Sequence, residues 1–336
     1  MAKALPPTPS HFRVRTLLPA LIIAGLSWHL PAAPAVAQDA PKLAVAASIV
    51  PLGDFCRQIG GELVQVQVLI PPGASPHAFE PPPSVMVRAA GARVLVYIGA
   101  GLEPWADKLR LSWGSRDVAV VEAARGMDLV RDVDHYHHVE PESPREKAGR
   151  AQKAGKLEKG EESPIHVAGN PHIWLDPVLA QDICRKIAAA FIQADPGHRA
   201  VYEANLENYL KELAALDQDI RERVKTWRLR EYVSFHPAYT YFARRYGLKE
   251  VGVMEPAPGR EPTPRHLQKV IKAIKHYGIK VVFAEPQLNP RVAEVVAQEA
   301  GVKVLMLDPV GGRPPYGSDY LQMMRHNLAT LEAAMK

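Results

Sequence analysis

Residues 195–227 have the sequence DPGHRAVYEANLENYLKELAALDQDIRERVKTW. Apolar side chains recur in it every three or four positions, at Leu206, Tyr209, Leu213, Leu216, Ile220, Val224 and Trp227. This spacing places them on one face of an α-helix. Asp195 as N-cap and Pro196 at the first helical position would be a favourable start. From Pro196 to Trp227 the helix would span roughly 48 Å. One small lobe needs no helix of that length, so the segment predicts a strut between two lobes.

On both sides of this segment, short apolar runs alternate with helix-like patterns. The runs before it are Leu43–Ala47, Val64–Ile70, Val94–Ile98 and Val118–Val121, and those after it are Tyr232–Phe235, Val251–Met254, Lys280–Ala284 and Lys303–Leu307. Nearly continuous apolar runs are typical of strands buried on both faces, as in parallel sheets. We therefore predict an α/β protein with two lobes, each with a mainly parallel sheet flanked by helices.

The chain length fits two lobes, because 336 residues are enough for about two domains of ordinary size. We place the N-terminal lobe at residues 38–194, the linking helix at 195–227 and the C-terminal lobe at 228–336. Within the first lobe, residues 134–166 are rich in charge and poor in large apolar side chains. Such a segment buries too little apolar surface to offset its ordering entropy, which predicts a mobile loop.

The first 37 residues have the three parts of a secretory signal. Three basic residues precede an apolar stretch, Leu17–Leu30, and Ala35-Val36-Ala37 forms a small-residue cleavage site. A membrane anchor is the alternative, but the apolar run is short of the ~20 residues that a spanning helix needs. We therefore expect a soluble periplasmic protein, cleaved after Ala37.

The charge of the chain argues against nucleic acid as a partner. The formal net charge is +5, and removal of the three basic signal residues lowers it to +2. The sequence has no long Lys/Arg stripe with interleaved aromatic residues.

Two cysteines, Cys56 and Cys184, lie at helical spacing among apolar residues. Free cysteine packs as a small hydrophobe, so we expect two buried thiols. A disulfide is the alternative, since the periplasm permits it.

Polar residues follow several predicted strands at the points where these strands end. His77 comes after the second strand through a Pro-rich turn, His236 after Tyr232–Phe235, Glu285 after Lys280–Ala284 and Asp308 after Lys303–Leu307. Ligands of parallel sheets bind outside the carboxyl ends of the strands. Each residue alone could be a surface side chain or a turn-forming carboxylate. Together they indicate one site.

Five segments carry a resemblance to a known family. They are Pro71–Pro82 (PPGASPHAFEPP), Asn170–Pro177 (NPHIWLDP), Ser234–Leu248 (SFHPAYTYFARRYGL), Glu285-Pro286-Gln287 and Leu307-Asp308-Pro309. In order and spacing the chain resembles ZnuA-type zinc-binding proteins, within the metal receptors of ABC importers. The resemblance implies two α/β lobes linked by one rigid helix, with the metal in the cleft between them.

The resemblance also implies a ligand set. His77, His172 and His236 would be imidazole ligands and Asp308 a carboxylate ligand, with Glu285 uncertain and expected to orient either a ligand or the lobe interface. The manganese branch of the family typically has a Glu at the position of His236, so His favours zinc, and imidazole suits zinc. The chain departs from many relatives in its loop, which holds only His135, His137, His138 and His166. A metal-gathering role for this loop and a plain solvated insertion both remain open.

The implied function is capture of Zn²⁺ in the periplasm and delivery to the membrane permease and ATPase subunits of an importer, by a monomer that is not an enzyme. A manganese receptor and a periplasmic zinc chaperone or adhesin are the alternatives. A zinc hydrolase is a further alternative, but the sequence has no His-Glu-x-x-His helix motif.

Overall fold

The computed structural model describes residue 1 and residues 41–114, 117–131, 169–256 and 259–336. The predicted signal peptide, residues 1–37, and the loop 134–166 with its four histidines lie outside the described residues. Residues 41–336 form one contact unit. In the part of the chain that is described, no helix has both the length and the apolar character needed to cross a bilayer.

The four strands before the linking helix form one parallel sheet in the order β2-β1-β3-β4. Their bounds are Leu43–Ala47 for β1, Val64–Val68 for β2, Val94–Tyr97 for β3 and Ala119–Glu122 for β4. Every residue of β3 is buried, as expected for an inner strand covered on both faces. Because all four strands run the same way, their carboxyl ends share one edge of the sheet.

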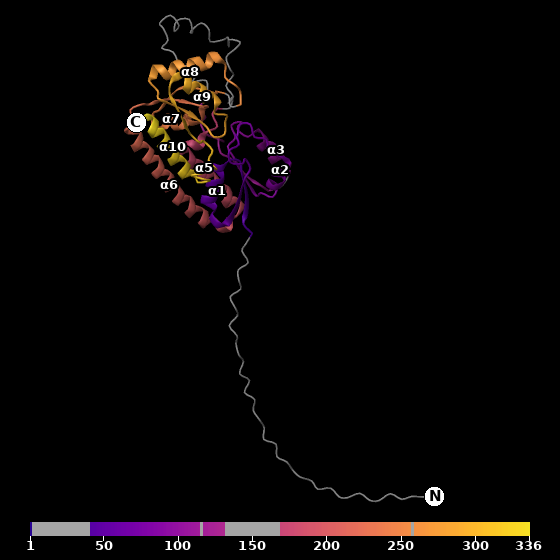
Figure 1. The fold of residues 1–336 in the computed structure, drawn as a ribbon. Helices are drawn as coiled ribbons and strands as arrows, with labels where there is room; N and C mark the ends of the chain where they lie inside the picture. Colours follow the sequence, from indigo (N-terminus) through magenta and orange to yellow (C-terminus); the bar gives the residue numbers. More distant parts are fainter. Residues whose placement is uncertain (2–40, 115–116, 132–168, 257–258) are drawn as a thin grey trace, which may run out of the picture. The chain divides into compact units, whose positions relative to one another are not determined.

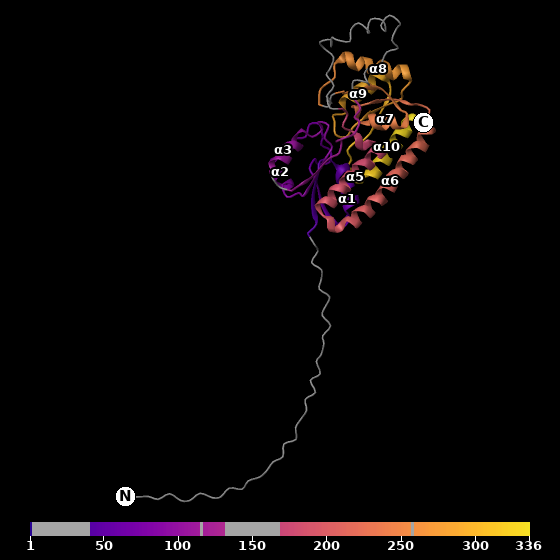
Figure 2. The same ribbon diagram turned by 180° about the vertical axis from the view of Figure 1, so that it is seen from behind.

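Helices cover this sheet on both sides (Figures 1 and 2). On one side α1, Val50–Gly60, and α5, Pro177–Ala194, pack against each other and against the strands. On the other side lie α2, Pro83–Ala89, and α3, Pro104–Ser112. A short 3-10 turn, Gly61–Leu63, leads from α1 into β2. The first lobe is therefore a three-layer α/β structure, as predicted.

The two cysteines are free thiols inside the first lobe. Cys56 lies on α1 and Cys184 on α5, and both are fully buried in the same apolar core. Burial raises the pKa of each thiol above its ordinary value. The prediction of two buried thiols is confirmed.

The linking helix is present but begins later than predicted. A 3-10 turn, Pro196–His198, precedes α6, which spans Arg199–Lys225. Asp195 is the N-cap residue of this turn and not of α6, and its side chain makes no capping hydrogen bond. Its carboxylate instead accepts a hydrogen bond from the Tyr202 hydroxyl at 2.7 Å and lies 2.7 Å from His198 Nδ1. Pairing with these two side chains, three and seven positions ahead, has replaced the backbone cap.

The long helix α6 runs beside α1, α5 and α10 along one side of residues 41–336 (Figures 1 and 2). Its 27 residues give a length of about 40 Å. The buried side chains are those of the predicted apolar face, from Tyr209 to Val224, with Tyr202 added two turns earlier. The helix thus joins the lobes and also packs against helices of both.

The four strands after α6 form two parallel pairs, β5 with β6 and β7 with β8, and β5 packs beside β7. Their bounds are Glu231–Ser234 for β5, Lys249–Val253 for β6, Val281–Ala284 for β7 and Lys303–Met306 for β8. The helices of this lobe are α7, Thr240–Tyr246, α8, Pro264–Tyr277, and α9, Arg291–Ala300, with a 3-10 turn at Pro237–Tyr239. All eight predicted strands are present to within a few residues.

The last helix, α10 (Tyr320–Met335), returns to the first lobe. It packs against α1 and α6, and the Tyr320 amide donates to Asp54 Oδ2 at 3.0 Å. The Tyr320 ring meets the Phe55 ring edge-on, with centroids 4.8 Å apart. The end of the chain is therefore fastened to one of its first helices.

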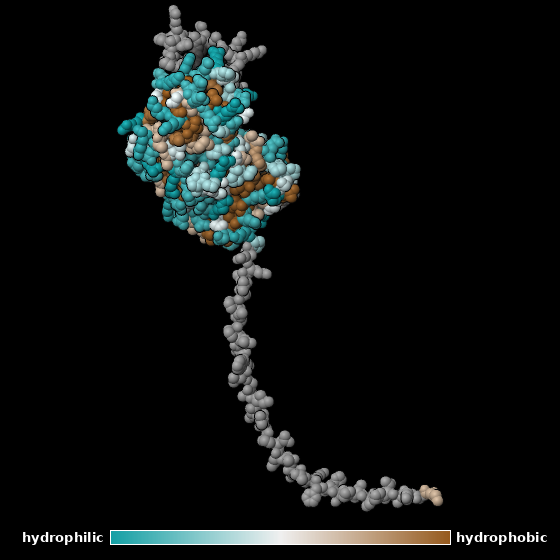
Figure 3. Space-filling model, in the orientation of Figure 1, coloured by the Kyte–Doolittle hydropathy of each residue, from teal (hydrophilic) through white to brown (hydrophobic). Residues whose placement is uncertain are grey.

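Most of the surface in Figure 3 is hydrophilic, with apolar residues scattered over it. Val87 on α2 and Leu111 on α3 are among the exposed large apolar side chains of the described residues. Single exposed apolar residues are ordinary on a protein surface and mark no interface.

Candidate metal centre

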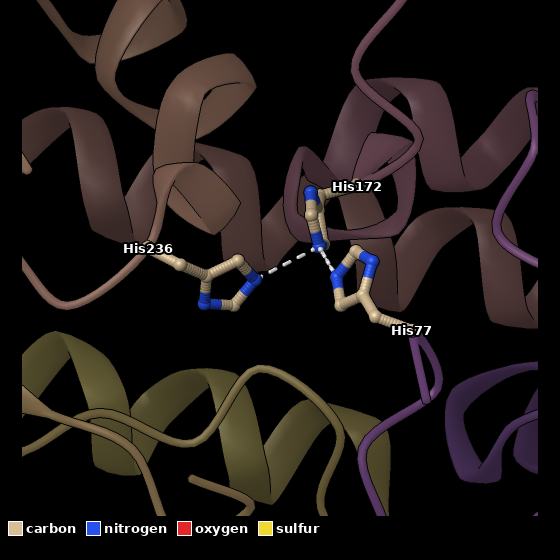
Figure 4. A group of neighbouring side chains, drawn as sticks. All are labelled: His77, His172 and His236. Carbon is tan, nitrogen blue, oxygen red and sulfur yellow. Dashed lines mark hydrogen bonds between the residues drawn. The ribbon is translucent and has the colours of Figure 1, made fainter. Parts of the chain in front are cut away.

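Three of the four predicted ligands converge at one point. His77 lies in the loop after β2, His172 just before a 3-10 turn at Ile173–Leu175, and His236 directly after Phe235, which follows β5. The His172 Nε2 atom lies 3.1 Å from His77 Nε2 and 3.1 Å from His236 Nε2 (Figure 4). The three side chains form a group that could hold a metal ion. Residues about 95 and 64 positions away in the sequence have thus been brought to His172.

The His172 ring is oriented by its neighbour Asn170. The Asn170 Oδ1 atom accepts from the His172 backbone amide at 3.0 Å and lies 2.8 Å from His172 Nδ1. Asn170 Nδ2 donates to Pro237 O at 2.7 Å, which identifies the oxygen as the atom facing the imidazole. An amide oxygen only accepts, so Nδ1 of His172 carries the proton. Its Nε2 is then the unprotonated atom that points to the other histidines.

The His236 ring is oriented by Glu285, the first residue after β7. His236 Nδ1 donates to Glu285 Oε1 at 2.6 Å, and the two side chains are each only 3% exposed. A carboxylate behind an imidazole fixes its tautomer and makes the far nitrogen a stronger ligand. Glu285 therefore contacts a ligand candidate and is not one of the group of three.

The spacing of the three nitrogens fits a cation better than it fits hydrogen bonds. A tetrahedral zinc ion with Zn–N bonds of about 2.0–2.1 Å holds its nitrogens about 3.3–3.4 Å apart. The two measured separations are 3.1 Å. Since His172 and His236 both carry their protons on Nδ1, their Nε2 lone pairs face each other. A positive ion between them would turn this repulsion into coordination.

His77 differs from the other two in its exposure, because it is only partly buried. Its loop packs against a loop of the second lobe, residues 311–313. A Cβ atom at Gly312 would lie 2.7 Å from the Pro72 Cβ, and one at Gly73 would overlap the Arg313 guanidinium. Both glycines also have positive φ, 86° and 85°. These close approaches bring the first-lobe loop up to the other two histidines.

Asp308, the fourth predicted ligand, lies outside the group of three. Its Oδ1 accepts from the Val310 and Gly311 amides and from Gln287 Nε2, and its Oδ2 accepts from the Tyr316 hydroxyl at 2.6 Å. Burial and this carboxylate raise the pKa of Tyr316. The Asn327 side chain of α10 accepts a hydrogen bond from the Asp308 backbone amide and donates one to the Asp308 carbonyl. The structure thus places Asp308 beside the site with its carboxylate already bound by four donors.

The pocket over the histidines is small. It is lined by the three histidines and by Trp174, Glu285, Gln287 and neighbouring residues of both lobes, and its volume is about 10 Å³. That is the room of about one water-sized sphere. Such a space admits a single ion but no organic molecule.

Sequence reasoning assigned no role to several residues that shape this pocket. Trp174 is fully buried against His172, with ring centroids 5.2 Å apart, and its Nε1 donates to Pro309 O at 2.6 Å. Asp176 caps α5 and binds Arg245 of α7. Asn170, Trp174 and Asp176 all belong to the motif that supplied His172. The sequence signal that could have identified them is the motif itself, which contains His172 together with the residues that hold it in place.

The first lobe buries a carboxylate of its own, which the sequence did not single out. Glu103 accepts from the Ser48 hydroxyl at 2.5 Å and from the Ile98 and Gly99 amides at 3.0 Å each. Burial raises the pKa of Glu103 from its ordinary 4.5 to about 7, against the lowering effect of these hydrogen bonds. All three donors lie in the same lobe as Glu103, next to the ends of β1 and β3.

Comparison with known proteins gives one consistent result. The family described as zinc-uptake complex component A, periplasmic (ZnuA), matches residues 45–334. The zinc-binding protein AdcA of Streptococcus pyogenes is 30% identical over 319 residues, which cover 94% of this chain and 60% of AdcA. The high-affinity zinc uptake system protein ZnuA of Bacillus subtilis is 30% identical over 298 residues, 88% of each chain. The chain thus spans about three fifths of AdcA but most of the Bacillus protein.

Among solved structures, a zinc-bound deletion mutant of ZnuA superposes with a TM-score of 0.72 at 28% identity, over 88% of this chain and 99% of that one. This agreement extends over both lobes and the helix between them.

Proposed function

Because the chain belongs to the ZnuA family of periplasmic zinc-uptake components, we propose that it captures Zn²⁺ outside the cytoplasm and delivers it to an ABC-type importer. The observation that carries this proposal is the convergence of three imidazoles in which His172 Nε2 lies 3.1 Å from Nε2 of each of the other two, close to the spacing of a zinc site. His77, His172 and His236 are the proposed ligands. Asp308 belongs to the same site in this proposal, since Gln287 links its carboxylate to the pocket.

The donor set supports zinc over manganese. Three borderline nitrogen donors suit zinc, whereas manganese prefers a set richer in carboxylate and other oxygen donors. Two of the three imidazoles also have their protons fixed on Nδ1 by Asn170 and Glu285, so no proton has to leave their Nε2 atoms before the ion binds.

The small pocket supports a receptor rather than a hydrolase. A hydrolytic zinc enzyme needs an open coordination position and room for an organic substrate beside the ion. Here the space is about 10 Å³. Glu285, the carboxylate nearest to the histidines among the described lining residues, is occupied in binding His236. Capture and release of the ion is the chemistry that remains.

The partners in this proposal are a membrane permease and an ATPase subunit, and the protein works as a monomer in the periplasm. The predicted cleavage after Ala37 would leave Gln38 as the mature N-terminus. Mass spectrometry of the protein isolated from the periplasm measures that terminus directly.

Two measurements test the function. Zinc and manganese titrations of the purified protein, in competition with a chelator, should give one tight site for zinc and a weaker one for manganese. Uptake of labelled zinc by cells that lack the chain should be restored by the wild type and not by His172→Ala. His276→Ala removes an exposed histidine of α8 and is the matched control. Tight manganese binding with weak zinc binding, or normal uptake without the chain, would refute the proposal.

A further inference from the structure

The way out of the metal pocket passes His77. Of the three converging histidines, His172 and His236 are only 2% and 3% exposed, whereas His77 is partly exposed. An ion that leaves the site therefore reaches the surface beside His77. A partner that takes the ion directly from the protein has to bind around this point.

Two loops, one from each lobe, meet beside this exit. The first-lobe loop carries His77 itself, and the second-lobe loop directly follows residues that line the pocket. The loops approach each other closely where Pro72 meets Gly312 and where Gly73 meets Arg313. The exposed residues at these contacts form a surface that we call the docking lip: Pro71, Pro72, Arg313, Pro314 and Pro315.

The docking lip is held in a fixed shape. The Gly312 amide donates to Gly317 O at 2.7 Å and the Gly317 amide donates to Arg313 O at 2.8 Å, which closes the second-lobe loop into a narrow turn. Tyr316 fastens this loop to the second lobe through its hydrogen bond to Asp308. Proline has a fixed φ, so the prolines of the lip lose little freedom when a partner binds. The lip is therefore a preorganised surface.

Arg313 is the charged residue of the docking lip. Its side chain is exposed, and its guanidinium lies against the turn at Gly73, a residue with no side chain to pair with it. Among the residues that the structure describes, this guanidinium has no hydrogen bond or ion pair. A guanidinium has five N–H donors in a rigid fork that matches a carboxylate in bidentate fashion. Arg313 can therefore bind a carboxylate from another molecule.

The chemistry of the partner follows from the ion that it must accept. Pathways for cations carry Asp and Glu side chains, because their charge attracts the ion. An entrance of this kind placed over the docking lip would set its carboxylates opposite Arg313. Opposite charges across an interface fix its register and speed the encounter of the two proteins.

We propose that the permease of the importer docks on the docking lip, and that Arg313 binds a carboxylate of the permease in a bidentate ion pair. This inference rests on the proposed capture and delivery of zinc. The lip contains residues of both lobes, so a permease bound there lies over the exit at His77.

Binding of the zinc-loaded protein to the permease–ATPase complex in lipid nanodiscs tests this inference. Arg313→Gln should weaken that binding by about 10–100-fold, the loss typical of a central interface arginine, and Arg313→Glu should weaken it further. Arg313→Lys should recover only part of the affinity, because an ammonium group cannot form the bidentate pair. The control is Lys275→Gln, which removes an equal charge from the exposed last turn of α8 and should dock like the wild type.

Two further measurements separate docking from other causes. Zinc affinity and the unfolding midpoint of Arg313→Gln should equal those of the wild type, since Arg313 does not line the pocket. Protein-free nanodiscs of the same anionic lipid should not bind the protein. The proposal would be overturned by undiminished docking of Arg313→Gln, by an equal loss of its zinc affinity, or by binding to the protein-free nanodiscs. A wild type that binds no zinc, or that never docks on the complex, would instead refute the proposed function.

Discussion

The two lobes share an architecture of parallel strands and covering helices, but they contribute to the candidate site very differently. The second lobe holds His236, Glu285, Gln287 and Asp308 at its strand ends. The segment of His172 is also hydrogen-bonded to the second lobe. Asn170 donates to Pro237 O, and Trp174 donates to Pro309 O. The first lobe supplies His77 and, by its place in the chain, His172, and its own buried carboxylate, Glu103, is bound within that lobe.

This difference suggests that the two lobes have different roles in one site, which we call the division of labour between them. Two imidazoles are already held, buried and with defined tautomers, against the second lobe. The third, on a partly exposed loop, completes the site from the other side. Two of the three imidazoles are thus preorganised against the second lobe, and the His77 loop of the first lobe completes the site.

The largest expected effect comes from removing one histidine on each side. His236→Ala and His77→Ala should both lower zinc affinity by more than about 100-fold, since a ligand matters more than its supporting groups. Only His236→Ala should also destabilise the metal-free protein, by about 1–3 kcal/mol, because it removes the imidazole that donates to the buried Glu285 and leaves only the weaker backbone hydrogen bond. Chelator competition and urea denaturation measure the two quantities. Equal loss of stability in both variants would contradict the division of labour.

Asn170→Ala should have the next largest effect. It removes the hydrogen bond to Pro237 O and leaves the His172 backbone amide without its side-chain acceptor, which should cost about 1–3 kcal/mol of unfolding free energy. Loss of the contact to His172 Nδ1 should lower zinc affinity by about 10–100-fold. The same two assays apply, with the exposed Asn208→Ala on α6 as control. Full zinc affinity in Asn170→Ala would show that the ring needs no support.

Glu103 allows a test of the first lobe alone through pH. Burial raises the pKa of its folded-state carboxyl to about 7, so the folded chain keeps a proton that the unfolded chain loses near pH 4.5. Stability from this group is therefore lost as pH rises from about 4.5 to about 7. Gln does not titrate. The free energy of unfolding of the wild type should therefore fall relative to that of Glu103→Gln, by up to about 3 kcal/mol between pH 4.5 and pH 8.

Denaturation of the metal-free proteins at several pH values measures that difference, with the exposed Glu299→Gln as reference. Zinc affinity at pH 8 should change little, because the donors around Glu103 all belong to the first lobe. A pH-independent difference would mean that Glu103 titrates normally.

The smallest effect is expected for the loop. Replacing residues 134–165 by a short Gly/Ser linker should leave zinc affinity and folding unchanged, since all three converging histidines lie elsewhere in the chain. Isothermal titration should still show one tight site. Loss of that site would reveal a ligand that the loop supplies.

The fold was largely predictable because apolar runs and helical spacing are local properties of the sequence. Strand bounds such as Leu43–Ala47 followed directly from composition. The start of the linking helix was mispredicted because Asp195 pairs with Tyr202, a side-chain choice that helix propensity does not decide. A meeting of His77 and His236 could be expected from strand ends, whereas His172 was added by the family resemblance, and the three do lie together. The hydrogen bonds of the Asp308 carboxylate could not be expected, because their donors lie in different segments: Gln287, the turn after Asp308, and Tyr316.

The return of α10 to the first lobe has a consequence for how the protein folds. Tyr320 bonds to Asp54, 266 positions earlier in the chain, and to the Trp174 carbonyl, while Asn327 fixes Asp308. Contacts between residues so distant in sequence slow folding, because a large loop must close before any of them is gained. Both the segment of His172 and the Asp308 turn depend on this last helix. A chain that emerges from its N-terminus first would therefore form these contacts around its metal pocket only after α10 has been synthesised.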